Sequence, residues 1–199
     1  MSDAPFVHPT AVVDDGAELG PRTKVWHFCH VMPGAVLGAG CNLGQNVFVS
    51  GTARLGKNVK VQNNVSIYDG VVCEDDVFLG PSCVFTNVST PRSAVNRRGQ
   101  YETTHVGRGA TIGANATIVC GVSLGAYSFI AAGAVVTQDV RAHALMMGVP
   151  ARQHGWTCHC GVTLRGDTGW EGLQCPECDA RYEASDDGIR RVGSGGPSQ

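Results

Sequence analysis

The feature that most constrains this chain is an apolar residue at every sixth position. Fourteen such positions follow one another, and each is followed four residues later by a small or β-branched residue. They are Val7, Val13, Leu19, Val25, Val31, Leu37, Leu43, Val49, Leu55, Val61, Ile67, Cys73, Leu79 and Phe85. A period of six fits neither a helix nor the alternation of one long strand, but it fits short strands joined by tight turns and stacked as a solenoid.

The period breaks after Asn87, resumes at Val106 and continues to Val136. Together these twenty hexads predict an all-β solenoid over residues 1–156. The pattern resembles the hexapeptide repeat of left-handed parallel β-helix proteins, in which three hexads make one coil, and this resemblance implies about seven coils. The interruption, residues 88–105, is an insertion, and long loops in compact domains are usually functional or disordered. It carries Arg92, Arg97, Arg98 and Tyr101.

Composition excludes some classes of protein. The chain has 199 residues, with 15 Lys and Arg against 17 Asp and Glu, so it lacks the basic excess of a nucleic-acid binder. No apolar run reaches the roughly 18 residues that cross a membrane, and the N-terminus lacks the basic region of a signal peptide. We therefore expect a cytoplasmic protein without membrane insertion. The 27 glycines suit many tight turns.

Four of the nine cysteines form two close pairs beyond the last hexad, Cys158-x-Cys160 and Cys175-x-x-Cys178, with the segment 161–174 between the pairs. This spacing predicts a tetrahedral thiolate zinc site in a zinc ribbon over residues 157–185. Four thiolates leave no open coordination position, so the predicted zinc is structural. A redox pair or disulfides are the alternative, and His154 or His159 could replace one sulfur.

The other five cysteines fall within the hexads, where buried cysteine acts as a small hydrophobe and core packing is the simplest interpretation. They are Cys29, Cys41, Cys73, Cys83 and Cys120. Residues 186–199, ending in GSGGPSQ, are expected to form a flexible tail.

Several stretches between about residues 7 and 156 resemble bacterial hexapeptide-repeat N-acetyltransferases of sugar nucleotides, especially those acting on UDP-2-acetamido-3-amino-2,3-dideoxy-glucuronate. They are VWHF at 25, LGQNVFV at 43, KVQNNVSIYDGV at 60, EDDVFLGPSCVFTN at 74, PRS at 91, GATIGANATIVCGV at 109 and ALMMGVPAR at 144. The resemblance implies a left-handed parallel β-helix, a homotrimer and an active site in the groove between two subunits.

It also implies transfer of an acetyl group from acetyl-CoA to the 3-amino group of the UDP sugar, in surface polysaccharide biosynthesis. An amine is a good nucleophile and a thioester an activated acyl donor, so such an enzyme needs mainly orientation and oxyanion stabilisation. The stretch from Phe85 to Arg92 lacks the histidine that related hydroxyl-acetylating enzymes carry there, which favours an amine acceptor.

Asn87 matches the position of the amine-orienting asparagine in the resembling family. We hypothesise that its side-chain oxygen accepts a hydrogen bond from the substrate amine while the departing thiolate takes the proton. The alternative is a turn residue that satisfies local backbone. Asp69, one coil below, is the reserve base, and His105, which matches no family motif, is a second reserve.

The sugar nucleotide needs polar side chains along one outer column, and residues separated by three hexads stack there. His27, Gln45 and Asn63 form such a column, with Asn64 and Tyr68 nearby in the resembling motif. Arg92 is placed to bind a phosphate or the sugar carboxylate as a bidentate donor. The alternative for each is a solvated surface residue.

For acetyl-CoA, the resemblance indicates the last coils, where small residues let pantetheine approach the backbone. The residues are Ala114, Ala132 and Gly133, with Thr137 and Arg152 near the nucleotide end. The alanines could equally be hexapeptide filling. Gln138 stands where many relatives have a lysine, so Arg141 could supply that phosphate contact. The ribbon is also absent from the usual pattern, and we expect it to cap the open end of the solenoid or to recruit a partner.

Three other functions remain open. An N-acetyltransferase of a dTDP-3-amino-3,6-dideoxyhexose would share fold, cofactor and mechanism. A γ-type carbonic anhydrase would need histidine pairs that the repeats lack, since His27 and His30 have the wrong partners. A noncatalytic β-helix scaffold would leave the polar columns and the arginine-bearing insertion unexplained.

Overall fold

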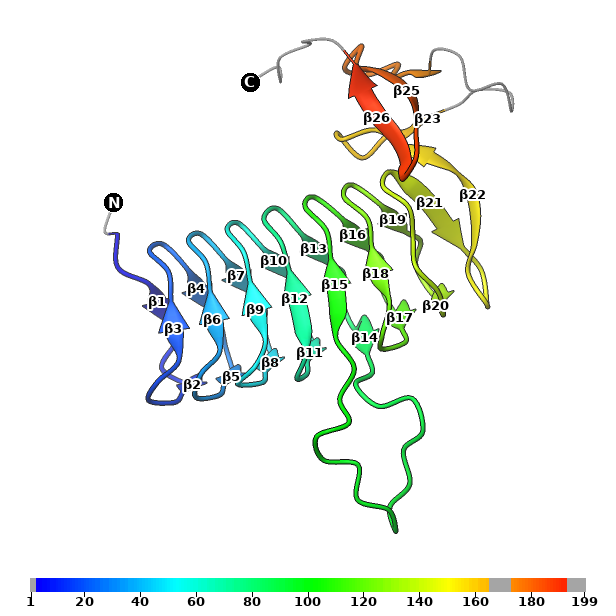
Figure 1. Ribbon diagram of the computed structural model, residues 1–199. Helices are drawn as coiled ribbons and strands as arrows, with labels where there is room; N and C mark the ends of the chain where they lie inside the picture. Colours follow the sequence, from blue (N-terminus) through cyan, green and yellow to red (C-terminus); the bar gives the residue numbers. More distant parts are fainter. Residues whose placement is uncertain (1–2, 165–172, 193–199) are drawn as a thin grey trace.

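The computed structural model describes residues 3–164 and 173–192, and it shows an all-β protein built as a parallel solenoid (Figure 1). Each coil runs through three short strands that belong to three different sheets, here called faces A, B and C. In Figure 1 the coils stack along one axis, a long loop leaves the stack between β14 and β15, and a small β-unit follows at the C-terminal end. The described residues contain no helix able to cross a membrane.

Face A is the longest, with eight parallel strands followed by two antiparallel ones. Its strands are β1 (Phe6–Val7), β4 (Lys24–Val25), β7 (Asn42–Leu43), β10 (Lys60–Val61), β13 (Phe78–Leu79), β16 (Thr111–Ile112), β19 (Phe129–Ile130), β21 (Ala144–Met147), β22 (Arg152–Thr157) and β23 (Thr163–Leu164).

Face B has seven strands and face C six. Face B contains β2 (Val12–Val13), β5 (His30–Val31), β8 (Phe48–Val49), β11 (Ser66–Ile67), β14 (Val84–Phe85), β17 (Thr117–Ile118) and β20 (Val135–Val136). Face C contains β3 (Glu18–Leu19), β6 (Val36–Leu37), β9 (Arg54–Leu55), β12 (Val71–Cys73), β15 (Thr104–Val106) and β18 (Ser123–Leu124).

Each strand pairs with the strand three hexads before it and the strand three hexads after it, as the periodicity predicted. Lys24 lies opposite Phe6 on one side and Asn42 on the other. Three corners connect the faces: the first corner joins A to B, the second joins B to C, and the third joins C back to A. Residues one coil apart in the sequence therefore stack along the same corner or face.

The interior holds the hexad residues and the small residues that follow them. Val25, Val31 and Leu43 are fully buried, whereas Val7 is 38% exposed because no coil precedes it. The five cysteines assigned to the core are all buried. Burial raises the pKa of Cys73, so its thiol stays protonated and packs as an apolar group.

The insertion is shorter than the sequence predicted. An uninterrupted coil would bring Ser89 opposite Val71, but Val71 pairs with Thr104, so the segment 89–103 is the chain inserted into this coil. The expected boundary at residue 105 was wrong, since Thr104 and His105 belong to β15. They were assigned to the loop because the hexad phase restarts only at Val106, although the preceding two residues already pair with β12.

The solenoid has about eight coils instead of seven. The additional rung is β21, in which Leu145 pairs with Phe129. If the six-residue period had continued, Met147 would have been the partner of Phe129. This shorter step breaks the phase, so a periodicity count stops at Val136. After β21 the chain reverses, and β22 extends face A in the antiparallel direction.

A C-terminal hairpin sheet follows, formed by β24 (Leu173–Gln174), β25 (Arg181–Ser185) and β26 (Gly188–Val192). Because β26 pairs with β25 over its whole length, the segment from 188 to 192 is ordered strand and not the expected tail. The rest of that predicted tail, 193–199, lies outside the described residues.

The hairpin sheet is docked against the last coils. The His143 ring stacks on Tyr127 and meets Tyr182 edge to face, with ring centroids 5.1 and 5.0 Å apart. His143 Nδ1 donates to the Thr157 carbonyl at 2.8 Å, because a carbonyl can only accept. The backbone N–H of Ala142 donates to the Asp187 carbonyl at 3.0 Å. These contacts tie the C-terminal unit to the third corner.

The close stacking of coils leads to a first prediction. A Cβ added at Gly38 would lie 2.5 Å from the Gly56 carbonyl oxygen, whereas one added at Gly155 meets nothing within 4 Å. Gly38→Ala should therefore force two coils apart and lower the free energy of unfolding by about 1–3 kcal/mol. Urea unfolding would measure this loss, with Gly155→Ala as the matched control. Equal midpoints for the two variants would contradict the stacking argument.

Candidate active site and cysteine cluster

The first corner carries one continuous column of turn residues, five of which were predicted to bind substrate or acetyl-CoA. Backbone hydrogen bonds of 2.9 to 3.0 Å join successive turns, so each turn stacks directly on the previous one. The members of the column are His27, Gln45, Asn63, Pro81, Ala114 and Ala132. The side chains change along it from polar at the N-terminal end to small at the C-terminal end. Three residues predicted for the acceptor, His27, Gln45 and Asn63, thus lie on one line with Ala114 and Ala132, which were predicted for acetyl-CoA.

The second corner carries Asn87, Asp69 and Tyr68, and the insertion leaves the solenoid here. The insertion closes at its base, where the Glu102 backbone N–H donates to the Asn87 carbonyl at 2.9 Å. The Asn87 side chain is half-buried, and within the described residues no hydrogen bond satisfies its amide group. The alternative of a side chain engaged with local backbone is therefore not supported, and the amide is available to a substrate.

One chain does not bring the two corners together. They lie at opposite ends of face B, since Asn64 comes before β11 and Asp69 after it, and five residues of chain reach at most about 18 Å. Within one chain, face B therefore separates the candidate catalytic residues on the second corner from the predicted column on the first.

Asp69 is held in a polar clamp. Ser50 Oγ donates to Asp69 Oδ1 at 2.6 Å, and Thr52 Oγ1 donates to the same oxygen at 2.7 Å. The Ser50 hydrogen bond, aided by Thr52, lowers the pKa of the Asp69 carboxyl despite some desolvation. A carboxylate with a lowered pKa is a weak base, so Asp69 is better suited to accept a hydrogen bond than to remove a proton.

Within the substrate column, two asparagines already have structural partners. Asn63 Oδ1 accepts the Gln45 backbone N–H at 2.8 Å, and Asn64 Oδ1 accepts from Asn46 Nδ2 at 3.0 Å. These amide ladders stabilise the turns, and each asparagine keeps its remaining groups at an exposed surface. Asn64 has φ of 61°, a conformation that asparagine tolerates well. Their binding roles remain predictions.

The other predicted residues lie as follows. The His27 ring stacks on His8 with centroids 3.5 Å apart, and Tyr68 lies at the second corner next to Phe48.

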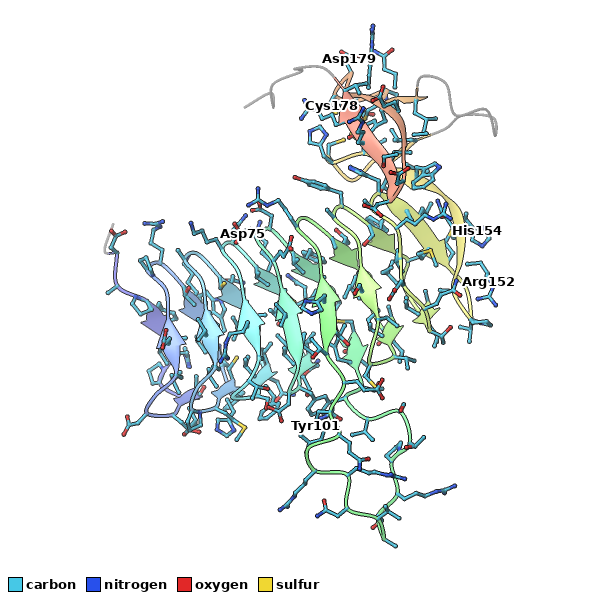
Figure 2. The ribbon with its side chains drawn as sticks, viewed as in Figure 1. Asp75, Tyr101, Arg152, His154, Cys178 and Asp179 are labelled. Atoms are coloured by element: carbon cyan, nitrogen blue, oxygen red, sulfur yellow. The ribbon has the colours of Figure 1, made fainter. Side chains whose placement is uncertain are left out.

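Thr137 is exposed at the end of β20, on the second corner. Arg152 is exposed on β22, where Figure 2 places it at the C-terminal end of the solenoid, away from the insertion. His105 lies on the outer side of face C, opposite Val72.

Two further features escaped the sequence analysis. Ser50 and Thr52 clamp Asp69, and their positions about three hexads before it in the sequence would have indicated stacking neighbours. Phe28 is 60% exposed with φ of 57°, at the turn position that Asn46 and Asn64 occupy in the next two coils. A bulky aromatic residue rarely adopts this conformation, and its presence in an asparagine column was the missed signal.

The four cysteines of the C-terminal unit converge. Their sulfur atoms all lie within 4.8 Å of one another, with Cys158 and Cys178 at 3.4 Å and Cys160 and Cys175 at 3.6 Å. A tetrahedral zinc with bonds of about 2.3 Å needs sulfur separations of about 3.8 Å. The donor set and its spacing therefore fit a thiolate zinc site, and Figure 2 shows Cys178 at this unit.

The surroundings of the cluster shift its thiols in different directions: the pKa of Cys158, Cys160 and Cys178 is raised, and only that of Cys175 is lowered. Burial of the Cys175 thiol opposes its ionisation, but hydrogen bonds from the backbone N–H groups of Glu177 and Cys178 outweigh it and lower the pKa of Cys175 to about 7. Tyr182 Oη lies 3.0 Å from Cys158 Sγ and accepts the His159 backbone N–H at 2.8 Å. His159 Nδ1 also lies near Tyr182 Oη, at 3.0 Å.

Among the described residues, these cysteines form the one group of three or more potential metal ligands. His30 Nε2 is 2.9 Å from Asp14 Oδ2 and His27 stacks on His8, so neither belongs to such a group. The carbonic anhydrase alternative gains no support from this arrangement.

Comparison with known proteins places the chain in a family. Residues 16–51 and 103–138 match the model described as "Bacterial transferase hexapeptide (six repeats)", and residues 34–69 match "Hexapeptide repeat of succinyl-transferase". The chain is 40% identical over 185 residues to dTDP-3-amino-3,6-dideoxy-alpha-D-galactopyranose 3-N-acetyltransferase of Aneurinibacillus thermoaerophilus, which covers 93% of this chain and 94% of the relative. The protein belongs to the hexapeptide-repeat acetyltransferases.

Solved structures agree with this assignment. This acetyltransferase is similar to a hexapeptide-repeat acetyltransferase of Vibrio cholerae O1 biovar eltor complexed with acetyl coenzyme A, with TM-score 0.55 and 30% identity over 62% of this chain and 70% of that one. A hexapeptide transferase family protein of Anaplasma phagocytophilum, 18% identical with TM-score 0.54, covers 77% of this chain and 80% of its own and shares the fold. The prediction of an acetyl-CoA-dependent acyltransferase is confirmed.

The clamp on Asp69 leads to a second prediction. In a Ser50→Ala, Thr52→Val variant the Asp69 carboxylate loses both hydroxyl donors, so its pKa should rise toward the ordinary value. The clamp stabilises the folded protein fully at pH values above the pKa that Asp69 has in the unfolded chain. This stabilisation is lost as the pH falls through the lowered pKa of Asp69 in the folded protein. The free energies of unfolding of variant and parent should therefore differ most near neutral pH. Carboxyl NMR titration measures the shift, and Ser66→Ala is the control. An unchanged Asp69 titration in the variant would refute the clamp.

Proposed function

We propose that this acetyltransferase transfers the acetyl group of acetyl-CoA to the 3-amino group of a nucleotide-linked amino sugar, most specifically a dTDP-3-amino-3,6-dideoxyhexose. The relative that spans nearly the whole chain bears the name of a dTDP-3-amino sugar acetyltransferase. This supports the dTDP acceptor better than the UDP-glucuronate acceptor that motif resemblance favoured. The single observation that carries the proposal is the unpartnered Asn87 amide at the base of the insertion.

The reaction needs few protein groups. The amine nitrogen attacks the thioester carbonyl carbon, the carbon–sulfur bond breaks, and the nitrogen loses a proton as the CoA thiolate becomes a thiol. Asn87 Oδ1 would accept a hydrogen bond from the amine and fix the direction of its lone pair. Asp69, ionised and one coil below, would stabilise the positive charge that develops on nitrogen. No strong general base is required.

We further propose that the active unit is a homotrimer. The two-corner arrangement supports this, because the column on the first corner lacks a catalytic residue and the second corner lacks the small-residue column. Ala114, Ala132 and Gly133 on one copy would bind the pantetheine arm, opposite Asn87 of the next. Gly133 offers open space, since a Cβ there would meet nothing within 4 Å.

The test of the reaction uses Asn87→Ala. With dTDP-3-amino-3,6-dideoxygalactose as acceptor, the parent should release CoA thiol, and the variant should lose roughly a hundredfold in kcat because the amine is no longer oriented. Ser89→Ala, exposed two residues later in the insertion, is the matched control and should keep full activity. Full turnover by trimeric Asn87→Ala would remove Asn87 from the mechanism, and a preference for the UDP-3-amino-glucuronate sugar would replace the acceptor.

We also propose that the four cysteines bind one structural zinc ion. The zinc would be held by Cys158, Cys160, Cys175 and Cys178 and would cross-link the β22–β23 turn to the β24–β25 hairpin. Such a site contributes its binding free energy to folding. The short separations inside the two sulfur pairs also admit disulfides, so the oxidation state must be measured together with the metal content.

Elemental analysis should find one zinc per chain, and none in Cys175→Ser. Cys29→Ser should keep its zinc, because that thiol lies in the solenoid and a hydroxyl can replace its 2.9 Å contact with the Gly44 carbonyl. Chelation should lower the Tm of the parent by roughly 5 °C or more. Thiol titration that finds two disulfides and no zinc would contradict the proposal.

A further inference from the structure

The insertion rejoins the solenoid at Glu102, directly beside the candidate catalytic residue. The Glu102 backbone N–H donates to the Asn87 carbonyl at 2.9 Å, which fixes Glu102 against the turn that carries Asn87. Figure 2 labels the preceding residue, Tyr101, at the junction of the loop and the coils. The Glu102 main chain also covers the turn below, since a Cβ on Gly70 would lie 3.1 Å from the Glu102 carbonyl oxygen. Gly70 follows Asp69, so Glu102 contacts the turns of both candidate catalytic residues.

The Glu102 side chain extends to the turn on the other side of Asn87. A Cβ placed on Gly121 would lie 2.6 Å from Glu102 Oε2, so the carboxylate occupies the space that a side chain at position 121 would fill. This turn stacks directly on the turn of Asn87, because the Cys120 N–H donates to Thr86 Oγ1 at 2.9 Å. Successive coils lie about 4.8 Å apart, so the Glu102 carboxylate lies roughly one coil spacing from the turn of Asn87.

The Glu102 carboxylate has no partner within the part of the chain that the structure describes. The salt bridges of residues 3–164 and 173–192 use other acids, and the arginines of the insertion, Arg92, Arg97 and Arg98, take part in none of them. Asp69 differs, because two hydroxyl groups already donate to its Oδ1. Glu102 is half-buried, and a carboxylate that has lost part of its water attracts a cation more strongly than one in bulk solvent.

The acceptor of the proposed reaction would bring a cation to this corner. An α-amino group, which like the amine of an amino sugar has electron-withdrawing neighbours, has a pKa of roughly 8. Such an amine is largely protonated near neutral pH, and its nitrogen becomes positive again when it attacks the thioester. The Asn87 amide can orient the nitrogen but carries no charge, whereas a carboxylate stabilises the positive charge itself. A hydroxyl group on the same sugar carbon would gain much less from a carboxylate.

We propose that the Glu102 carboxylate binds the protonated amine of the acceptor and makes the site prefer an amino sugar over the same sugar with a hydroxyl group. This inference rests on the proposed function for the place of the amine at Asn87. Glu102 holds the ammonium group, and the ammonium then loses a proton to water. Glu102 and Asp69 together stabilise the charge that returns to the nitrogen during attack. Glu102 is a specificity-determining residue and not a general base.

Calorimetric titration with two ligands tests this role without turnover. They are dTDP-3-amino-3,6-dideoxygalactose and dTDP-6-deoxygalactose, which carries a hydroxyl group at the same carbon. The parent should bind the amine about tenfold more tightly. Glu102→Gln should remove this preference by weakening the amine alone, because the side chain keeps its shape and loses its charge. Glu102→Asp, which keeps the charge on a shorter side chain, should restore part of it. Glu18→Gln, which removes an exposed carboxylate of β3, should bind both ligands as the parent does.

The ratio of the two affinities separates this role from a structural one. Both ligands are measured on one preparation of each variant, and the hydrogen bond that closes the loop uses the backbone N–H, which every variant keeps. An equal loss of affinity for both ligands in Glu102→Gln overturns the proposal, and so does a preference equal to that of the parent. Glu102→Ala makes the same comparison if Glu102→Gln does not form the parent's oligomer.

Turnover separates this inference from the proposed function. With the amino sugar, kcat/KM should fall about tenfold in Glu102→Gln, while the KM for acetyl-CoA stays unchanged. If the parent prefers the amine and Glu102→Gln does not, yet the parent releases no CoA thiol, the amine site stands and acetyl transfer is rejected. If the parent acetylates the amino sugar without binding the amine more tightly than the hydroxyl, the function stands and the role of Glu102 is rejected.

Discussion

The whole structure depends on the backbone ladder between successive coils. Each strand of two or three residues is too short to be stable alone, and it is held by hydrogen bonds to the coil before and the coil after it. This ladder fixes which side chains can meet. Ser50 and Thr52 reach Asp69 because they lie within a residue of one coil below it, and Asn63 reaches the turn of Gln45 for the same reason.

The three-sided coil also separates two groups of candidate site residues. The polar and small-residue column follows the first corner, whereas Asn87, Asp69 and the insertion occupy the second. Face B keeps the two apart within one chain. The same rigidity fixes the geometry of each corner, since neighbouring coils cannot slip without breaking every rung. In the proposed trimer, two such corners would meet without rearranging either.

The C-terminal unit interrupts this regular pattern and stabilises its end. Thr157 is both a partner of His143 in the last coil and the residue before Cys158, so the docking contacts and the cysteine cluster are adjacent. Tyr182 links them again, because its ring meets His143 and its hydroxyl contacts Cys158. Two residues, Thr157 and Tyr182, thus connect the cysteine cluster to the last coil.

The sequence by itself determined the solenoid, its inward residues and the stacking of His27, Gln45 and Asn63, because a strict six-residue period leaves one way to bury every apolar position. It also located the four converging cysteines, whose pairs are close in the chain. The tertiary structure alone decided the rest. The eighth rung, the true start of β15 and the hairpin over residues 188–192 depend on pairing with distant strands, which local periodicity does not record. The clamp on Asp69 and the closure of the insertion by the Glu102–Asn87 hydrogen bond arise only when coils stack and the insertion folds back, because they are relations between residues that are remote in the chain.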